Sequence, residues 1–450
     1  MKRIFLPLAL LGALLIGACG SDSSLPEATG KANIRAINAI PTSQEVNFLI
    51  EERLIGSAPY QGATNPAQYD DLEYTFNVDV FFAGNTNIRR VARQFLDVEA
   101  NKDYTFLLSG EVASPTITVW QGDERTFDET DTVFAAQFAH ASGSLGNLDY
   151  YFADAGTVPA LGNAVATLSF GEISAPVDFP AGDFVLFITT AGDPNDVVYT
   201  SNTTTFAARD TIVFATFDGD VRNTAPVFVR ALGNLGANVA LPDANFPPTV
   251  QFFNGSMDLG NVDIYDDEAL TSLRVADHGF LDATADLDVA VGANTFYYTP
   301  AGDTSAVTIE APLGAFGGLR HRFVAIGLAG NLNSLSFIPD IRPVETQVKV
   351  LPYSASNNFA FVDLYAVEPD SSIDDVLPVR AALTAGIASG AGSLPAGSFD
   401  LYLTAFGEKD VLAGPYRIDV ALGDVVDFVI VDTVDPAVLD IAFLSGGPTP

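Results

Sequence analysis

Short stretches in which apolar and polar residues alternate run through most of the chain, separated by clusters of Gly, Asp, Asn and Pro. In one of them, Val362, Leu364 and Ala366 would share one face of a strand, and the residues between them would share the other. One buried face and one solvated face are typical of antiparallel sheets. No stretch has the pattern of a capped amphipathic helix of three turns. The alternation therefore predicts an all-β protein.

One strand pattern occurs four times at a nearly constant spacing. Each copy has an aliphatic residue, then Asn or Asp, then a second apolar residue, and three of the four continue with Tyr. The copies begin 102, 114 and 100 residues apart, at Val46, Leu148, Val262 and Val362. A repeat of this length indicates tandem domains. A domain of about 100 residues is large enough for a hydrophobic core of its own.

Polar or proline-rich stretches separate the copies and set the expected domain boundaries. The sequence predicts four tandem antiparallel β-sandwich domains, of immunoglobulin-like or transthyretin-like topology, and leaves both topologies open. The domains are expected at residues 31–127, 128–246, 247–342 and 343–450. Because proline restricts the backbone and stiffens a linker, proline-bounded joins predict an extended rod of separate domains.

The first residues are typical of a bacterial lipoprotein signal peptide, expected at residues 1–18. Two basic residues precede an apolar run, too short to span a bilayer, that ends in small residues before Cys19. Cys19 is the expected lipidation site, and residues 19–30 are expected to form a flexible tether. The alternative is an ordinary signal peptide with an incidental Cys. Gly20, in place of Asp, favours an outer-membrane anchor, with the domains facing the periplasm or the cell surface.

The repeated residues resemble the DUF4397 domain, whose function is unknown. The resemblance rests on an opening strand that ends in Asn, a Val-Asp-aliphatic-Tyr strand, a Pro-Ala-Gly turn before an apolar strand, and a late strand that enters a Gly turn. It covers nearly all of residues 31–445. Such domains often occur in tandem in exported bacterial proteins. The resemblance therefore implies a tandem DUF4397-domain lipoprotein, and it supplies no catalytic residues.

The charge of the chain is strongly negative. It has 56 acidic and 21 basic side chains, which give a formal net charge of −35. Nucleic-acid binding depends on Lys and Arg at phosphates, so we expect no nucleic-acid partner. A surface of this charge favours solubility, and a dedicated cation-binding role is the alternative.

Residues that commonly carry catalysis or bind metal ions are sparse. His140 takes a repeat position that Asn38 and Asn254 hold elsewhere, while His278 and His321 have no second His near them. A lone His is more often structural than a metal ligand. No zincin, nucleophile-elbow or phosphate-loop motif is present. We therefore predict no catalytic residue, no metal site and no cofactor, and we expect that the protein is not an enzyme.

Several loops carry clusters of carboxylates that could offer oxygen ligands to Ca²⁺. None has the spacing of an EF-hand, and in a chain this acidic such clusters are expected from composition. We interpret them as solvated loops, with calcium sites as the alternative. The clusters begin at Asp128, Asp218, Asp266 and Asp432.

The strand pattern itself offers polar and aromatic candidates. Its Asn or Asp recurs in every domain, which indicates a hydrogen bond at the strand edge and not a single active site. These residues are Asn47, Asp149, Asp263 and Asp363. Its Tyr is expected on the solvated face, where packing across the sheet is favoured and contact with a sugar or polymer is the alternative. The candidate ligand-contact aromatics are Tyr151, Tyr265 and Tyr365.

The sequence therefore favours a lipid-anchored, non-enzymatic module with a structural or adhesive role in the cell envelope. Its expected partners are the membrane, through the anchor, and an extracellular polymer or protein. The alternative function is that of a lipoprotein that binds carbohydrate or another extracellular polymer.

Overall fold

The computed structural model describes residues 27–448 except 84, 155 and 235. The expected signal peptide, Cys19 and the tether up to residue 26 lie outside the described residues. Within the described part, strands dominate and the one helix is a single 3-10 turn, η1 (Met257–Leu259). The predicted all-β fold class is confirmed. None of the described helices is long or apolar enough to cross a membrane.

The strands form four groups, and we keep the predicted boundaries to name the domains. The first domain has β1 (Lys31–Asn38), β2 (Val46–Ile50), β3 (Arg53–Ala58), β4 (Gly62–Ala63), β5 (Ala67–Asp70), β6 (Glu73–Phe82), β7 (Asn85–Asp97), β8 (Lys102–Glu111) and β9 (Ser114–Asp123). The second has β10 (Val133–His140), β11 (Leu148–Asp154), β12 (Ala166–Leu168), β13 (Val177–Pro180), β14 (Gly182–Thr190), β15 (Val197–Thr200), β16 (Thr204–Phe206), β17 (Thr211–Asp218), β18 (Val227–Gly233) and β19 (Asn238–Leu241).

The last two domains repeat the arrangement with fewer strands. The third has β20 (Thr249–Asn254), β21 (Val262–Tyr265), β22 (Leu273–His278), β23 (Leu287–Asp288), β24 (Gly292–Pro300), β25 (Ile309–Ala315), β26 (Arg320–Ile326) and β27 (Asn333–Phe337). The fourth has β28 (Val348–Ser354), β29 (Phe361–Val367), β30 (Arg380–Thr384), β31 (Gly392–Leu394), β32 (Gly397–Ala405), β33 (Val411–Val420), β34 (Val425–Asp432) and β35 (Leu439–Ser445).

Each domain consists of two sheets with the same strand order. In the third domain the sheets are β23-β20-β26-β27 and β22-β21-β24-β25, and in the fourth they are β31-β28-β34-β35 and β30-β29-β32-β33. The opening strand pairs in parallel with a late strand in every domain, as β1 does with β8 and β28 with β34. The expected all-antiparallel pairing is therefore wrong at this one pair of strands in each domain. Between the two strands the chain passes through the other sheet, which lets it return in the same direction.

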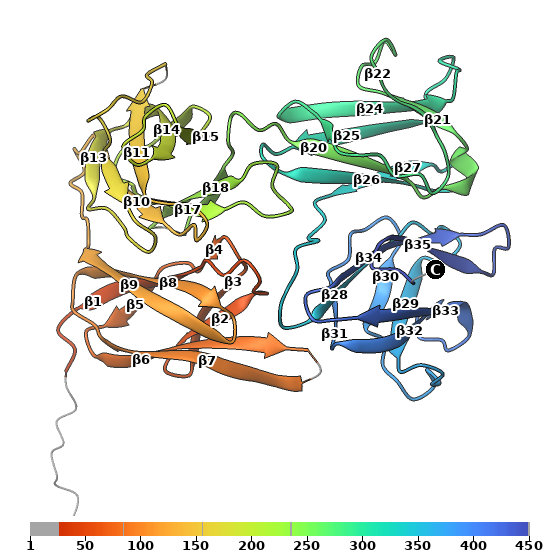
Figure 1. The fold of residues 1–450 in the computed structure, drawn as a ribbon, viewed down its shortest axis with the longest axis horizontal. Helices are drawn as coiled ribbons and strands as arrows, with labels where there is room; N and C mark the ends of the chain where they lie inside the picture. Colours follow the sequence, from red (N-terminus) through yellow and green to blue (C-terminus); the bar gives the residue numbers. More distant parts are fainter. Residues whose placement is uncertain (1–26, 84, 155, 235, 449–450) are drawn as a thin grey trace, which may run out of the picture.

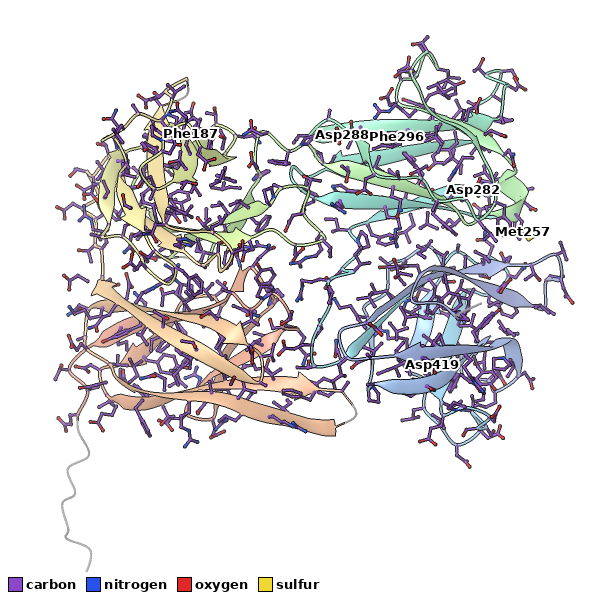
Figure 2. The ribbon with its side chains drawn as sticks, in the orientation of Figure 1. Phe187, Met257, Asp282, Asp288, Phe296 and Asp419 are labelled. Atoms are coloured by element: carbon purple, nitrogen blue, oxygen red, sulfur yellow. The ribbon has the colours of Figure 1, made fainter. Side chains whose placement is uncertain are left out.

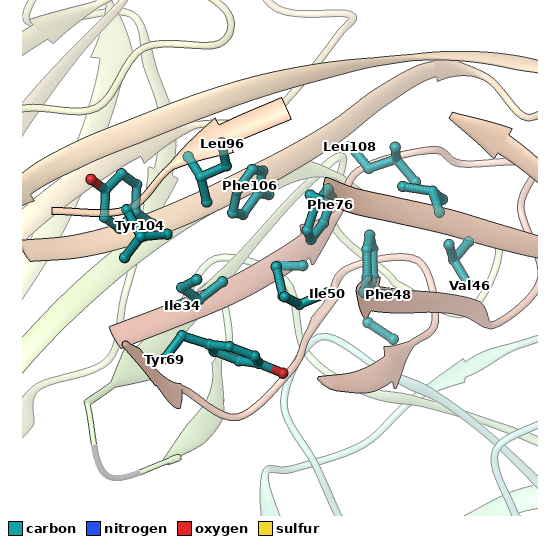
Figure 3. Close-up of a cluster of buried hydrophobic side chains, with 14 of the residues drawn as sticks. Ile34, Val46, Phe48, Ile50, Tyr69, Phe76, Leu96, Tyr104, Phe106 and Leu108 are labelled. Carbon is teal, nitrogen blue, oxygen red and sulfur yellow. The ribbon is translucent and has the colours of Figure 1, made fainter. Parts of the chain in front are cut away.

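A separate core lies between the two sheets of each domain, built from the alternating apolar residues. In the first domain the ring of Phe76 stacks on that of Phe106, with ring centroids 3.8 Å apart (Figure 3). The ring centroid of Phe76 lies 5.9 Å from that of Phe48. Phe296, labelled in Figure 2, has the corresponding buried position in the third domain, where its ring meets that of Phe323. Four separate cores are the reason to treat these units as domains.

The four domains do not form a rod. They occupy the corners of a square, in chain order around it (Figure 1). The first and second domains bury a shared apolar cluster that includes Ile37 and Leu107 of one and Phe217 of the other. The third and fourth do the same with Phe253 and Tyr353. The prediction of an extended rod is therefore wrong, because the outer faces of the opening sheets are apolar and pack on each other.

The proline-bounded join after the third domain lies at the centre of this assembly. Arg342 Nη1 donates to the backbone oxygens of Pro41 (2.6 Å) and Ser43 in the first domain. Its Nε lies 3.8 Å from Asp220 of the second domain. Lys349 of the fourth domain pairs with Asp340 at 3.1 Å. This central polar cluster (Asp220, Asp340, Arg342 and Lys349) ties together segments of all four predicted domains.

Candidate functional site

The repeated tyrosines are buried, so the expectation that they face solvent is wrong. Tyr151, Tyr265 and Tyr365 are 4%, 7% and 2% exposed. Each lies on an inner strand of its sheet, flanked by neighbours on both sides. Tyr365 also packs with Ile373, and Lys409 Nζ lies 4.3 Å from its ring centroid. Their position fits packing and leaves them no surface for contact with a polymer.

The repeated Asp binds the backbone of its own domain. In three domains one carboxylate oxygen accepts a hydrogen bond from the N–H of a turn glycine that follows the neighbouring strand. The pairs are Asp149 with Gly192 (2.8 Å), Asp263 with Gly302 (2.9 Å) and Asp363 with Gly407 (2.9 Å). Asn47 instead accepts from Ser57 Oγ at 2.6 Å. This residue therefore holds a turn or an adjacent strand in place and is not a free ligand group.

The residue at the end of the opening strand has an equally structural role. Asn38, His140 and Asn254 each accept a hydrogen bond from the backbone N–H two residues later, at 3.1, 3.3 and 3.1 Å. His140 Nε2 also lies 2.8 Å from the backbone oxygen of Gly146. The imidazole thus takes the place of an amide, and burial lowers its pKa.

The other two histidines are also buried and isolated. His321 Nε2 accepts from the backbone N–H of Phe316 at 3.2 Å. His278 Nε2 is sealed from solvent with no hydrogen-bond partner among the described residues. Burial lowers the pKa of both imidazoles, which favours their neutral form at pH 7. No group of three or more His, Cys, Asp or Glu in the described part of the chain is placed to hold a metal ion.

The acidic clusters contain carboxylates that cap loops. Asp218 accepts from Ser144 Oγ at 2.6 Å and from the backbone N–H of Gly143 at 3.0 Å. Asp432 accepts in the same way from Ser356 Oγ, at 2.5 Å. Asp267 accepts from the N–H of Ser272 at 2.7 Å. These oxygens already have donors from the protein.

The interfaces between domains carry the features that sequence reasoning missed. Where the third domain meets the fourth, Arg322 Nη1 lies 2.9 Å from Asp427, and both side chains are almost fully buried. Arg322 Nε also donates to Gln251 at 2.9 Å. The guanidinium is therefore matched by a carboxylate across the interface.

The interface between the first and second domains has an arginine that no carboxylate contacts directly. Arg35 Nε donates to Thr105 Oγ1 (3.0 Å) and Nη1 to the backbone oxygen of Leu232 (3.2 Å). Arg35 is 7% exposed. No carboxylate of the described residues lies within 4.0 Å of its nitrogens. Burial lowers the pKa of Arg35 to about 10, so it is still charged at pH 7.

Beside Arg35 lies a cleft of about 380 Å³ between the two domains. The first domain contributes Arg35, Asp103, Thr105, Trp120, Gln121, Gly122 and Asp123, and the second contributes Gln137, Ile173, Ser174, Ala175 and Pro176. Trp120 is the single Trp of the chain, and its Nε1 donates to the backbone oxygen of Gly171 at 2.7 Å. Clefts at domain interfaces that combine apolar walls with a few polar groups are common binding sites.

Sequence reasoning passed over this cleft because its residues come from distant strands. The available signals were the single Trp120 and the charged Arg35 in an otherwise apolar run. Neither signal is specific without the packing of the two domains, which places them on one cavity.

Comparison with solved structures and curated proteins adds no function. One similar structure is a carbohydrate-binding module of family CBM26 from Eubacterium rectale Amy13K, solved in complex with maltoheptaose. It is 13% identical, the match covers 44% of this chain and 95% of that chain, and the TM-score is 0.16. The search of curated proteins finds no match.

Comparison with family models gives one match, to the "Domain of unknown function (DUF4397)", over residues 32–151. The matched region covers the first domain and extends into the second as far as Tyr151 in β11. The resemblance drawn from the repeated residues is thereby confirmed for residues 32–151.

Proposed function

We propose that this chain is a non-enzymatic structural or adhesion module of the cell envelope, anchored in the outer membrane through a lipid on Cys19. The observation that carries the proposal is the closure of four β-sandwich domains into one body. Such a body presents a large surface whose domains are fixed relative to one another. The tether between Cys19 and the first strand would set its distance from the membrane.

The way the polar residues are used supports a non-catalytic role. The histidine with two ring contacts, His140, binds backbone groups, and the repeated aspartates hold turns. A catalytic acid or base needs a side chain that can reach a substrate in a pocket. His140 and the repeated aspartates are committed to the fold in this way.

The test uses a bacterium that lacks the chain and is supplied with either the full chain or Cys19→Ser. We expect the full chain in the membrane fraction and an increase of several fold in attachment of the cells to a surface. The variant should leave the membrane, because it loses acyl chains that contribute about 0.8 kcal/mol per buried CH₂, and attachment should fall to the background. Membrane retention of the variant with unchanged mass would contradict the anchor. Equal attachment with and without the chain would contradict adhesion.

A second candidate function, binding of an extracellular polymer, is favoured by the cleft beside Arg35 and Trp120. A retention assay on immobilised neutral and acidic polysaccharides tests it with the purified chain. We expect retention by at least one polysaccharide. No retention on any polymer by a folded chain would remove this candidate.

A further inference from the structure

The two paired interfaces of this protein use equivalent positions, and they differ in whether a carboxylate contacts the buried arginine. The backbone N–H groups of Ala39, Ala141, Gly255 and Ala355 bind the oxygens of Leu108, Thr216, Ala325 and Ile430, which aligns the four opening sheets. In each domain, one position on the outer face of the late strand lies three residues before the residue that supplies this oxygen. It holds Thr105, Val213, Arg322 and Asp427 in the four domains in turn.

Between the third and fourth domains this position supplies both halves of the buried pair Arg322–Asp427. Between the first and second domains the arginine is on the neighbouring strand, as Arg35, and the position equivalent to Asp427 holds Val213. Burying a charge without a partner is costly, and a buried arginine is normally matched by an acid. The first interface keeps the cation, but the acid that acts on it, Asp103 of the same domain, makes no direct contact with it.

A cleft lined by Arg35 lies at this interface. Arg35 Nη2 makes no hydrogen bond to the described residues, so it has capacity for a further acceptor. Two acids also line the cleft: Asp123 pairs with Lys102 at 2.6 Å, and Asp103 accepts a hydrogen bond from Asn33 at 2.9 Å and attracts Arg35 without direct contact.

We propose that the cleft between the first and second domains binds an acidic saccharide, whose carboxylate makes the direct ion pair with Arg35 that no residue of the protein makes. A guanidinium matches a carboxylate in shape and charge. The amides of Gln121 and Gln137 offer hydrogen bonds to hydroxyl groups, and Ile173 and Pro176 offer apolar contacts to a sugar ring. The volume, about 380 Å³, falls within the range of small-ligand sites, roughly 300–1,000 Å³.

The net charge of −35 opposes an anionic ligand at long range. At physiological ionic strength charges are screened over roughly 8 Å. Within the cleft, Arg35 attracts a ligand carboxylate by direct contact, while Asp103 and Asp123 oppose it from the lining. The proposal rests on the polymer-binding candidate and names the chemistry of its ligand. It is independent of adhesion.

The experiment measures the fluorescence of Trp120, which reports on this cleft because the chain has no other Trp. The purified full chain is titrated with glucuronate, with glucose as the neutral counterpart, and with acetate as the bare carboxylate. We expect a saturable change with glucuronate and at least tenfold weaker binding of glucose and acetate. No saturable change with glucuronate, or equal affinity for glucose, overturns the proposal. If acetate binds as tightly as glucuronate, the site recognises the carboxylate alone, and the proposal that the ligand is a saccharide is wrong.

Two variants and a control locate the site. Arg35→Gln should weaken glucuronate binding at least tenfold, and Val213→Asp should do the same by supplying an internal acid at the position equivalent to Asp427. Arg53→Gln, at a separate cavity beside Tyr69, should leave it unchanged. If Arg35→Gln binds glucuronate as tightly as the wild type, the proposal is wrong. If a variant does not fold, the wild-type titration alone tests the proposal. Retention on neutral polysaccharides without any response to glucuronate would preserve polymer binding and reject the acidic ligand.

Discussion

Single polar residues in this protein bind backbone groups of their own domain. Asn38, His140 and Asn254 make the same hydrogen bond at the end of the opening strand, although one is an imidazole and two are amides. What the position requires is an acceptor for one N–H and a second polar atom directed at the following loop. Sequence comparison between the repeats was sufficient to identify this requirement.

We predict that His140→Asn preserves the stability of the second domain at pH 7.5 and makes it less sensitive to acid. Burial lowers the pKa of His140, so below about pH 6.5 the unfolded chain takes up a proton that the folded chain does not. Stability is therefore lost as the pH falls, by no more than about 2 kcal/mol at pH 5. Urea denaturation at both pH values measures this. A variant that loses as much stability as the wild type between pH 7.5 and 5 would contradict it.

At the residue scale, the sequence predicted the role of a residue where the same residue type recurred at the same position of each repeat. It did not predict which side chains are buried. The role of Asp263 and Asp363 followed from their recurrence. The exposure expected for Tyr365 followed from alternation alone, which cannot show that a loop with Ile373 covers that face. Arg35 gave no repeat signal, since the other domains hold Gln or Leu at its position.

At the scale of elements, the strand pattern links a neighbouring strand and a turn through one carboxylate. Asp363 accepts from the N–H of Ala382 at 2.8 Å and from that of Gly407 at 2.9 Å, and it is 3% exposed. Gly407 has a φ of 77°, which a residue with a side chain rarely adopts, so the turn depends on both the glycine and its acceptor. The repeat of this strand thus preserves a way of joining β29, β30 and the end of β32.

We predict that Asp363→Ala destabilises the fourth domain by about 2–3 kcal/mol. Two buried N–H groups would lose their acceptor, and each unsatisfied group costs about 1–3 kcal/mol, partly relieved by water. The measurement is the midpoint of urea denaturation. The exposed Asp375→Ala is the control and should change stability by less than about 0.5 kcal/mol. Equal effects of the two substitutions would mean that Asp363 does not hold β30 and the turn at Gly407 in place.

The opening and late strands differ from the others in a way that the sequence displays. β17 and β34 are almost continuous apolar runs, and nearly all their residues are buried. Continuous runs indicate strands covered on both faces. Alternation of apolar and polar residues in the other strands led to the interpretation that every sheet has one solvated face. The continuous apolar runs of the late strands depart from that pattern, and they were the signal that a second domain covers these sheets.

At the scale of the whole molecule, the packing of outer sheet faces turns four sandwiches into one assembly. The joins contain proline, as expected, but the join at Arg342 fills the centre and does not hold the domains apart. Proline content predicts the stiffness of a linker and says nothing about the direction in which the next domain packs. That direction depends on side chains such as Ile37 and Tyr353, far from the joins.

We predict that Asp427→Asn weakens the contact between the third and fourth domains by about 3–5 kcal/mol, because it leaves Arg322 buried without its acid. Replacing both residues by apolar ones, Arg322→Met with Asp427→Leu, should restore most of this loss. The exposed pair Arg125–Asp178 is the control, and Asp178→Asn should cost less than about 1 kcal/mol. A double variant as unstable as Asp427→Asn would show that packing at this place requires the ions.

We also predict that residues 343–450, expressed alone, form a β-rich domain that associates with itself. The fragment has its own core, so a cooperative thermal transition is expected. It also exposes Leu351, Tyr353 and Val429, which the third domain covers in the full chain. Residues 247–450 should be monomeric under the same conditions, as judged by sedimentation. A monomeric short fragment would contradict the importance of this interface.

Small-angle X-ray scattering of the full mature chain distinguishes one closed body of four domains from an extended rod. From the size of a single domain, a square of four predicts a radius of gyration of about 25 Å, and a rod of four predicts more than roughly 40 Å. We expect the smaller value, unchanged between low and high salt. A radius near that of the rod would contradict the closed body and restore the extended array.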